Sequence, residues 1–217
     1  LLGHIRAAGM KHVVLGTSYR AEVFEEHFGD GSDLGLEIEY VFEAEPLGTG
    51  GGIRNVLDKL RYDTAMIFNG DVLGGTDLRA VLGTHAEKDA DVTMHLVRVP
   101  DPRAFGCVPT DEDGRVLEFL EKTQDPPTDQ INAGIYVFRR EIIESIPAGR
   151  PISVEREIFP ALLDRGMNVY GHVDYAYWRD MGTPGDFVRG SSDLVRGIAP
   201  SPLLEGKPVS YTHLTLP

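Results

Sequence analysis

Cysteine, long apolar stretches and positive charge are all scarce in this sequence, and each scarcity excludes something. The single cysteine among 217 residues, Cys107, leaves no partner for an internal disulfide, which is usual in a reducing compartment. No apolar run approaches the roughly 20 residues needed to cross a bilayer, and no signal peptide is visible. We therefore expect a cytoplasmic protein without a membrane partner.

The charge balance is strongly acidic. The 21 lysines and arginines are outnumbered by 34 acidic residues, which gives a net charge of −13 and no basic patch, so nucleic-acid binding is disfavoured. The hydrophobic content of 41% is ordinary for a globular protein, and the length suits one large domain with a real core. In so acidic a chain, a site for anionic ligands needs local basic side chains, backbone N–H groups or a metal ion.

The first half of the chain alternates short apolar strands with helices. We expect strands over residues 12–15, 36–42, 65–68 and 92–99, and helices over 19–28, 52–60 and 77–87. Strand–helix alternation at this spacing is typical of βαβ units. The pattern therefore predicts an α/β fold with a mainly parallel, mixed sheet flanked by helices.

The second half changes character. Residues 106–120 read as a β-hairpin with a long loop. Beyond it we expect strands over 135–138, 168–173 and 175–178. Ser153 is a suitable N-cap for a helix over 155–163, and Thr183 with Pro184 suits the start of a helix over 185–195. No repeat or clear linker divides the chain.

Two aspartates each close a strand-like run, and they are the strongest chemical signal. Asp71 follows the apolar run 65–68 through Asn69 and Gly70, and Asp180 lies in the segment 175–184. Ligands of open α/β sheets bind outside the carboxyl ends of strands, where such acids would face them. Either aspartate alone could be a turn or capping residue. Together they favour a shared Mg²⁺, which meets phosphates through one or two carboxylates.

Three further segments carry candidate binding residues. Residues 45–52 are glycine-dense and could expose backbone groups to a flat ligand, although the run is neither a Walker A loop nor a dinucleotide fingerprint. Glu121 and Lys122 end a strand and could hold a sugar hydroxyl and a phosphate, or could be ordinary surface charge. Asn132 could bind a hydroxyl through its amide, or could be a turn asparagine.

Taken in order, these motifs resemble the sugar nucleotidyltransferases, and among them the mannose-1-phosphate guanylyltransferases. The resemblance covers about residues 1–200 and implies a Rossmann-like nucleotidyltransferase domain. It implies that Asp71 and Asp180 bind Mg²⁺ and that Lys122 orients the attacking phosphate. It also implies two binding sets: Gly48, Thr49, Asn69 and Gly70 for the nucleotide, and Gly106, Glu121, Lys122 and Asn132 for the sugar phosphate.

The activity implied is transfer of a nucleotidyl group to a sugar 1-phosphate with release of pyrophosphate. GTP and mannose 1-phosphate would be the substrates and GDP-mannose the product, with a homo-oligomer possible. Two alternatives stay open. One is a glucose-1-phosphate thymidylyl- or uridylyltransferase, since base choice depends on few contacts. The other is a non-catalytic regulatory relative, which the retention of Asp71 and Asp180 argues against.

The chain departs from this family at both ends. Family members begin with a strand and a glycine-rich loop that carries a Gly-Thr-Arg-Leu signature, and no such segment is present here. We therefore expect a truncated catalytic domain over 1–200, lacking its first strand, and inactive as it stands. Residues 201–217 would be a short tail, and 208–217, which have no charged Asp, Glu, Lys or Arg, a non-native addition.

Overall fold

The computed structural model describes residues 1–18 and 20–202, so the expected non-native segment 208–217 lies outside the described residues. The helices are α1 (Leu2–Ala7), α2 (Ala21–Phe28), α3 (Gly48–Asn55), α4 (Leu78–Glu87), α5 (Arg140–Ser145), α6 (Phe159–Asp164) and α7 (Pro184–Val195), with a π-helix over Val154–Ile158. The strands are β1 (His12–Thr17), β2 (Glu37–Phe42), β3 (Thr64–Phe68), β4 (Val72–Gly74), β5 (Val92–Arg98), β6 (Gly106–Cys107), β7 (Leu120–Glu121), β8 (Gln130–Arg139), β9 (Val169–Asp174) and β10 (Trp178–Asp180).

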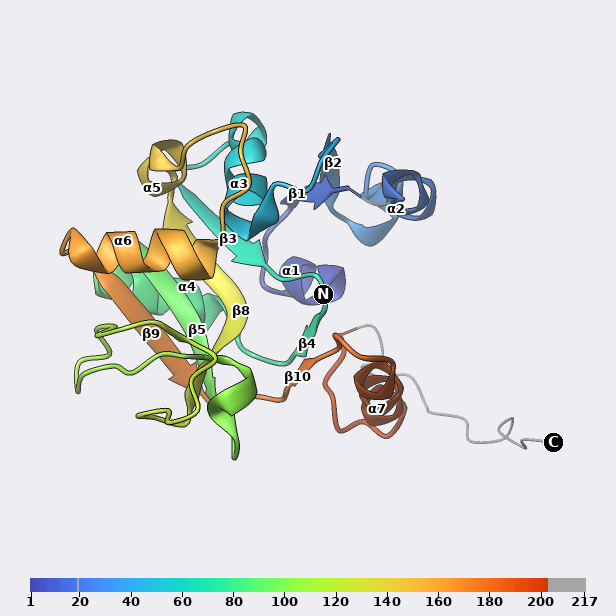
Figure 1. Ribbon diagram of the computed structural model, residues 1–217. Coiled ribbons are helices and arrows are strands. Elements are labelled where there is room, and N and C mark those ends of the chain that lie inside the picture. The colour runs from blue at the N-terminus through green and yellow to red at the C-terminus, as the bar shows by residue number, and fades with distance from the viewer. Residues whose placement is uncertain (19, 203–217) are drawn as a thin grey trace.

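The central sheet is built around β8 (Figure 1). The strand β5 runs along one edge of β8, while β3 and β6 share its other edge, and β9 and β7 extend the sheet. The sheet is mixed and flanked by helices, as expected, but it is not mainly parallel. β8 runs antiparallel to β3, β5 and β6, and β5 with β9 is the parallel pair of this sheet. The β3–α4–β5 unit has the expected direction, and β8 inserts between its two strands.

A second, two-stranded sheet is formed by β1 and β2, which pair in parallel across α2. Among the described residues, β1 has β2 as its single strand partner and β3 has β8. Packing joins the two sheets instead: Val13 and Ile38 belong to one buried cluster with Leu78 of α4 and Ile135 of β8. The β1–α2–β2 unit therefore rests on the central sheet through side chains.

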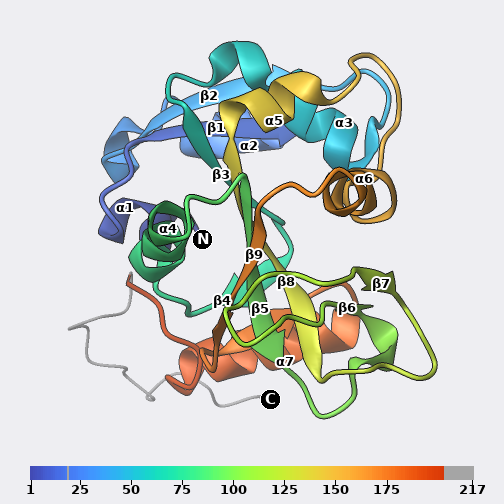
Figure 2. The same cartoon turned by 90° about the vertical axis from the view of Figure 1, so that its left-hand side faces the viewer.

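Buried side chains cover both faces of β8: Tyr136 and Phe138 belong to the largest cluster, and Ile135 belongs to the cluster that contains Leu78 of α4. Tyr136, Phe138 and Phe159 are among the largest fully buried side chains, and the Tyr136 and Phe159 rings lie 5.2 Å apart. Figure 2 shows α4 on one side of the sheet and α6 on the other. β8 extends well beyond the expected 135–138, because its residues 130–132 pair with β5 on one edge and Ile131 pairs with Cys107 of β6 on the other. None of the described helices combines the length and apolar character that a bilayer crossing requires.

A small antiparallel ribbon, β4 with β10, leads into α7. Asp180 pairs with Val72 and Trp178 pairs with Gly74. The strand expected over 175–178 therefore lies at Trp178–Asp180, because the short β4, which the sequence pattern did not reveal, decides where pairing occurs. Helix α7 begins as expected: Thr183 is its N-cap, accepting from the Asp186 N–H at 3.1 Å, and Pro184 is its first residue.

Candidate active site

The β4–β10 ribbon brings the two predicted metal ligands to one place. The Asp71 carbonyl accepts a hydrogen bond from the Met181 N–H at 2.9 Å, next to the pairing of Asp180 with Val72. Asp71 and Asp180 line a cavity of about 220 Å³, called here the carboxylate cavity. The other predicted residues in its wall are Asn69, Gly106, Glu121, Lys122 and Asn132. Residues from five separate segments of the sequence therefore meet in one cavity.

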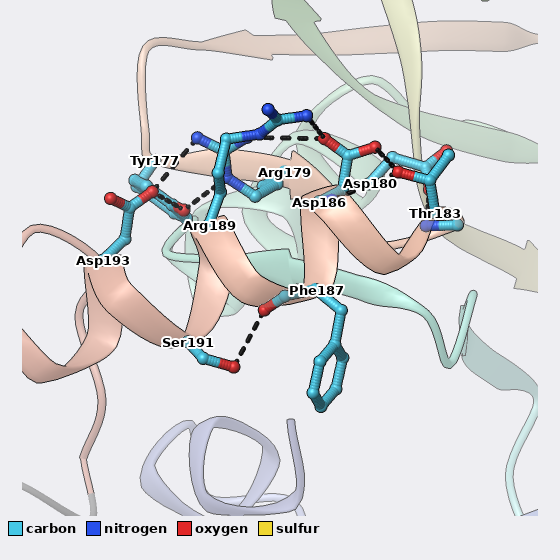
Figure 3. A network of polar contacts seen from close by, with 10 residues as sticks. Tyr177, Arg179, Asp180, Thr183, Asp186, Phe187, Arg189, Ser191 and Asp193 are labelled. Carbon is cyan, nitrogen blue, oxygen red and sulfur yellow. Dashed lines mark hydrogen bonds and ion pairs between the residues drawn. The ribbon is translucent and has the colours of Figure 1, made fainter. Parts of the chain in front are cut away.

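The side chains of β10 alternate between this cavity and α7. Trp178 and Asp180 line the cavity, and Asp180 Oδ1 accepts from the Gly182 N–H at 2.7 Å. Arg179, between them, donates to the Tyr177 hydroxyl at 3.1 Å and to Asp193 at 3.1 Å (Figure 3). Arg179 therefore ties β10 to α7 and is not among the residues that line the cavity.

Asn132 lies in the strand β8 and not in a turn. Its side-chain N–H donates to the Tyr136 hydroxyl at 2.7 Å, and its Oδ1 accepts from the Gly134 N–H at 3.0 Å. Gly134 has a φ of +79° and its carbonyl accepts from the Asn69 N–H at 2.8 Å. An amide has two N–H donors and two acceptor lone pairs, so Asn132 keeps one of each for a ligand.

Lys122 follows the short strand β7, in which Glu121 pairs with Gly106. Its backbone φ of +45° is in the left-handed region, which non-glycine residues rarely adopt and which is often found at functional sites. Lys122 is the single basic side chain among the described residues that line the carboxylate cavity. It faces four carboxylates there, those of Asp71, Glu121, Glu155 and Asp180.

This balance of charge bears on which ions the cavity could hold. Four carboxylates against one ammonium group would repel an anionic ligand. The described residues contain no group of three or more histidine, cysteine or acidic side chains placed to hold a metal. Two carboxylates that leave coordination positions for phosphate and water suit a hard divalent cation. Asp71 and Asp180 therefore fit such a cation, which would also offset the local negative charge.

The glycine-rich segment lies beside a second cavity of about 460 Å³, called here the loop cavity. The helix expected over 52–60 begins instead at Gly48, so the glycines are its first turns. The Gly50 N–H donates to the Ile152 carbonyl at 2.8 Å, and a Cβ on Gly51 would lie 2.8 Å from the Arg150 carbonyl oxygen. The glycines thus let α3 approach the 150–152 backbone closely, and that packing outweighs their poor helix propensity.

Three of the four predicted nucleotide residues divide between the two cavities. Gly48 and Thr49 line the loop cavity, and Asn69 lines the carboxylate cavity. Gly70 is in neither wall; it is exposed, and a Cβ on it would meet nothing within 4 Å. The structure thus gives Gly70 no packing reason to be glycine.

Glu155, Tyr136 and Trp178 are site residues that the sequence analysis did not find. Glu155 lines both cavities and accepts from the Thr49 hydroxyl at 2.9 Å. Tyr136 is 1% exposed, and burial raises the pKa of its hydroxyl, with the Glu155 charge adding to the effect. Trp178 could have been found from the sequence, because it is the aromatic residue two positions before Asp180. The other two lie in segments that read as ordinary helix and buried strand.

The fold defined by this geometry is that of nucleotide-transferring α/β enzymes. The chain is similar to the solved structure of HddC from Yersinia pseudotuberculosis, with a TM-score of 0.78 and 26% identity over 89% of this chain and 83% of that chain. A crystal structure of HddC complexed with GMP-PN is similar to the same extent. Residues 1–197 match the nucleotidyl transferase family, and the chain belongs to that family.

Two relatives show the range of similarity within the family. The chain is 70% identical to mannose-1-phosphate guanylyltransferase of Mycobacterium tuberculosis, over 95% of this chain and 58% of that protein. It is 32% identical to D-glycero-alpha-D-manno-heptose 1-phosphate guanylyltransferase of Aneurinibacillus thermoaerophilus, over 88% of this chain and 81% of that protein. The chain covers 58%, 50% and 60% of the length of the first three curated relatives. It therefore spans about half to three-fifths of the length of these proteins.

Proposed function

We propose that the full-length protein carrying this chain transfers a guanylyl group from GTP to mannose 1-phosphate, releasing pyrophosphate and forming GDP-mannose. The observation that carries the proposal is that Asp71, directly before β4, and Asp180, at the end of β10, lie in one cavity with Lys122. The 70% identity to a mannose-1-phosphate guanylyltransferase supports this choice of nucleotide and sugar.

Asp71 and Asp180 would hold Mg²⁺, the hard divalent cation that most often accompanies nucleoside triphosphates. When bound, the ion neutralises phosphate charge and so favours attack on the α-phosphorus. The remaining cavity residues act on the substrates directly. Lys122 would orient the sugar 1-phosphate by charge, and the free hydrogen-bonding positions of Asn132, together with Glu121, would hold sugar hydroxyls.

The reaction places modest chemical demands on the protein. An oxygen of the sugar phosphate attacks the α-phosphorus, the bond to the pyrophosphate oxygen breaks, and its electron pair leaves with pyrophosphate. A phosphate monoester is already ionised near neutral pH, so no general base is needed. Positioning and charge neutralisation therefore supply most of the acceleration. Gly48 and Thr49 would contact the nucleotide from the N-terminus of α3.

Pyrophosphate release by the full-length protein tests this proposal. The protein would be given Mg²⁺, GTP and mannose 1-phosphate, with ATP, UTP, dTTP and glucose 1-phosphate in parallel reactions. Release that prefers GTP with mannose 1-phosphate supports both the reaction and its substrates. Preference for dTTP or UTP with glucose 1-phosphate would keep the reaction class and change the substrates. Absence of release with every pair would reject catalysis and favour a regulatory relative.

A further inference from the structure

Glu155 occupies the boundary between the two cavities. The loop cavity and the carboxylate cavity share just two lining residues among those the structure describes, Glu121 and Glu155. Glu155 lies in the π-helix Val154–Ile158, a rare geometry that occurs frequently at functional sites. Its side chain is half-buried, so it meets both ligand space and protein.

Polar contacts lead from this carboxylate into both cavities. On the loop side, Glu155 Oε2 accepts from the Thr49 hydroxyl at 2.9 Å and from the Ser153 hydroxyl at 3.0 Å. On the other side, Glu155 lies near the Tyr136 hydroxyl, whose pKa is raised by burial and by the Glu155 charge, and that hydroxyl accepts from the Asn132 side chain at 2.7 Å. Thr49 and Asn132, far apart in the sequence, are thus linked through one acidic group.

The chemistry of this link requires a carboxylate. The Thr49 hydroxyl accepts from the Val154 N–H at 2.9 Å, so its own proton points to Glu155. The Tyr136 hydroxyl accepts from Asn132, which leaves its own proton for an acceptor, and Glu155 is the carboxylate whose charge acts on it most strongly. An ionised carboxylate is purely an acceptor and can receive all of these donors, whereas a glutamine would present a donor to at least one of them.

From this geometry, and resting on the proposed function, we infer that Glu155 is a positioning residue that couples the nucleotide subsite to the sugar-phosphate subsite. It holds Thr49 at the start of α3 and, through Tyr136, holds Asn132 in β8. Disturbing one subsite therefore disturbs the other, and loss of Glu155 loosens both.

Hydrogen–deuterium exchange of the full-length protein tests the coupling without any substrate. In Glu155→Ala, amides of residues 48–52 and 132–136 should exchange faster together, and Glu155→Gln should give a smaller increase in both. Faster exchange confined to 153–158 would overturn the inference. Should Glu155→Ala fail to fold, Thr49→Val and Tyr136→Phe test the same coupling, since each should raise exchange at the far subsite. Glu141→Gln, at an exposed position of α5 outside both cavities, is the matched control.

Steady-state kinetics supplies the second readout. Glu155→Gln should raise KM for both substrates about threefold to tenfold, with a smaller change in kcat. Thr49→Val should act mainly on KM for the nucleotide and Tyr136→Phe mainly on KM for the sugar phosphate. When Thr49→Val or Tyr136→Phe is combined with Glu155→Ala, the KM values should rise little further, because the shared link is already broken. If the KM effects of the single variants multiply fully in the double variants, the coupling is overturned. A wild-type protein inactive with every substrate pair rejects the proposed function, while the exchange experiment still decides the role of Glu155.

Discussion

The indole N–H of Trp178 donates a hydrogen bond to the Ala133 carbonyl, 3.0 Å away, and so ties β10 to β8. The strand that carries Asp180 is thereby fixed against the strand that carries Asn132. Trp178 also packs edge-on against Phe105, with ring centroids 5.3 Å apart, and lines the carboxylate cavity. The two sides of this cavity are therefore held together by a side chain that is itself in its wall.

Trp178 is the single tryptophan of the chain, so its fluorescence should report ligand binding. We expect GTP with Mg²⁺, and separately mannose 1-phosphate, to change its emission in the full-length protein in a saturable way. Trp178→Phe should remove the signal and lower stability by about 1 kcal/mol, because the Ala133 carbonyl loses its donor. Calorimetric binding that leaves the emission unchanged would show that the ligands bind elsewhere.

Replacing Asp180 with asparagine should separate chemistry from stability. The new amide would keep an oxygen for the Gly182 N–H, so the free energy of unfolding should change by less than about 1 kcal/mol. Turnover should fall by more than about a hundredfold. Loss of a residue that only hydrogen-bonds to a metal ligand typically costs about tenfold to a hundredfold, so a larger loss indicates direct metal binding. Pyrophosphate release at several Mg²⁺ concentrations measures this, with Asp164→Asn, at an exposed end of α6, as control. Near-normal turnover of Asp180→Asn would exclude the metal role.

Adding a methyl group at Gly134, in the wall of the carboxylate cavity, should destabilise the protein. Its φ is +79°, and an added Cβ would lie 2.9 Å from Asn69 Nδ2. Gly134→Ala should therefore lower the free energy of unfolding by about 1–3 kcal/mol and displace Asn69. The matched control is Gly83→Ala in α4, where a Cβ meets nothing within 4 Å and should stabilise by about 0.5–1 kcal/mol. Denaturant unfolding compares the two; equal stability of both variants would contradict this reading.

Local patterns in the sequence predicted most elements and the grouping of the site. The run 65–68 predicted a strand, the pattern over 77–87 predicted a helix, and Thr183 predicted a helix start, and the structure confirms all three. Seven predicted residues line one cavity because each lies near a strand end or hairpin, where short motifs are informative. Whether these residues act as assigned stays a prediction.

What the sequence did not reveal depends on contacts between distant segments. The insertion of β8 between β3 and β5 is set by pairing, which strand–helix alternation does not encode. The glycines of α3 are explained by the 150–152 backbone against which they pack, about a hundred residues later in the chain. The role inferred for Glu155 likewise depends on its position next to Thr49 and Tyr136, which the sequence around Glu155 does not show.

The edges of β1 and β3 lead to a prediction about the 217-residue chain itself. Within the described residues each strand pairs along one edge, and unpaired strand edges promote association between chains. We expect this chain to self-associate at micromolar concentration. Size-exclusion chromatography with light scattering measures this. A monodisperse monomer that unfolds in a single cooperative transition would show that these edges are harmless.

The pH dependence of stability should reveal a partly buried acidic group outside the cavities. Asp174, at the end of β9, accepts from His95 Nε2 at 3.0 Å, from the Thr76 hydroxyl and from the Ala176 N–H. Burial opposes its ionisation, but the hydrogen bonds from His95 and Thr76 outweigh burial and lower its pKa from 3.8 to about 2. A pKa depressed by folding stabilises the native state above pH 3.8, and this contribution is lost as the pH falls through about 2.

Asp174→Asn should therefore be less stable than the wild type by about 1–3 kcal/mol near neutral pH. The difference should stay constant down to about pH 5 and shrink below about pH 4, because the wild type then loses the charge that the variant lacks. Denaturant unfolding at a series of pH values measures this in the full-length protein. Asp113→Asn, in the exposed hairpin turn, should follow the wild type throughout. A stability gap for Asp174→Asn that persists unchanged to pH values near 2 would show that packing, and not charge, makes Asp174 important.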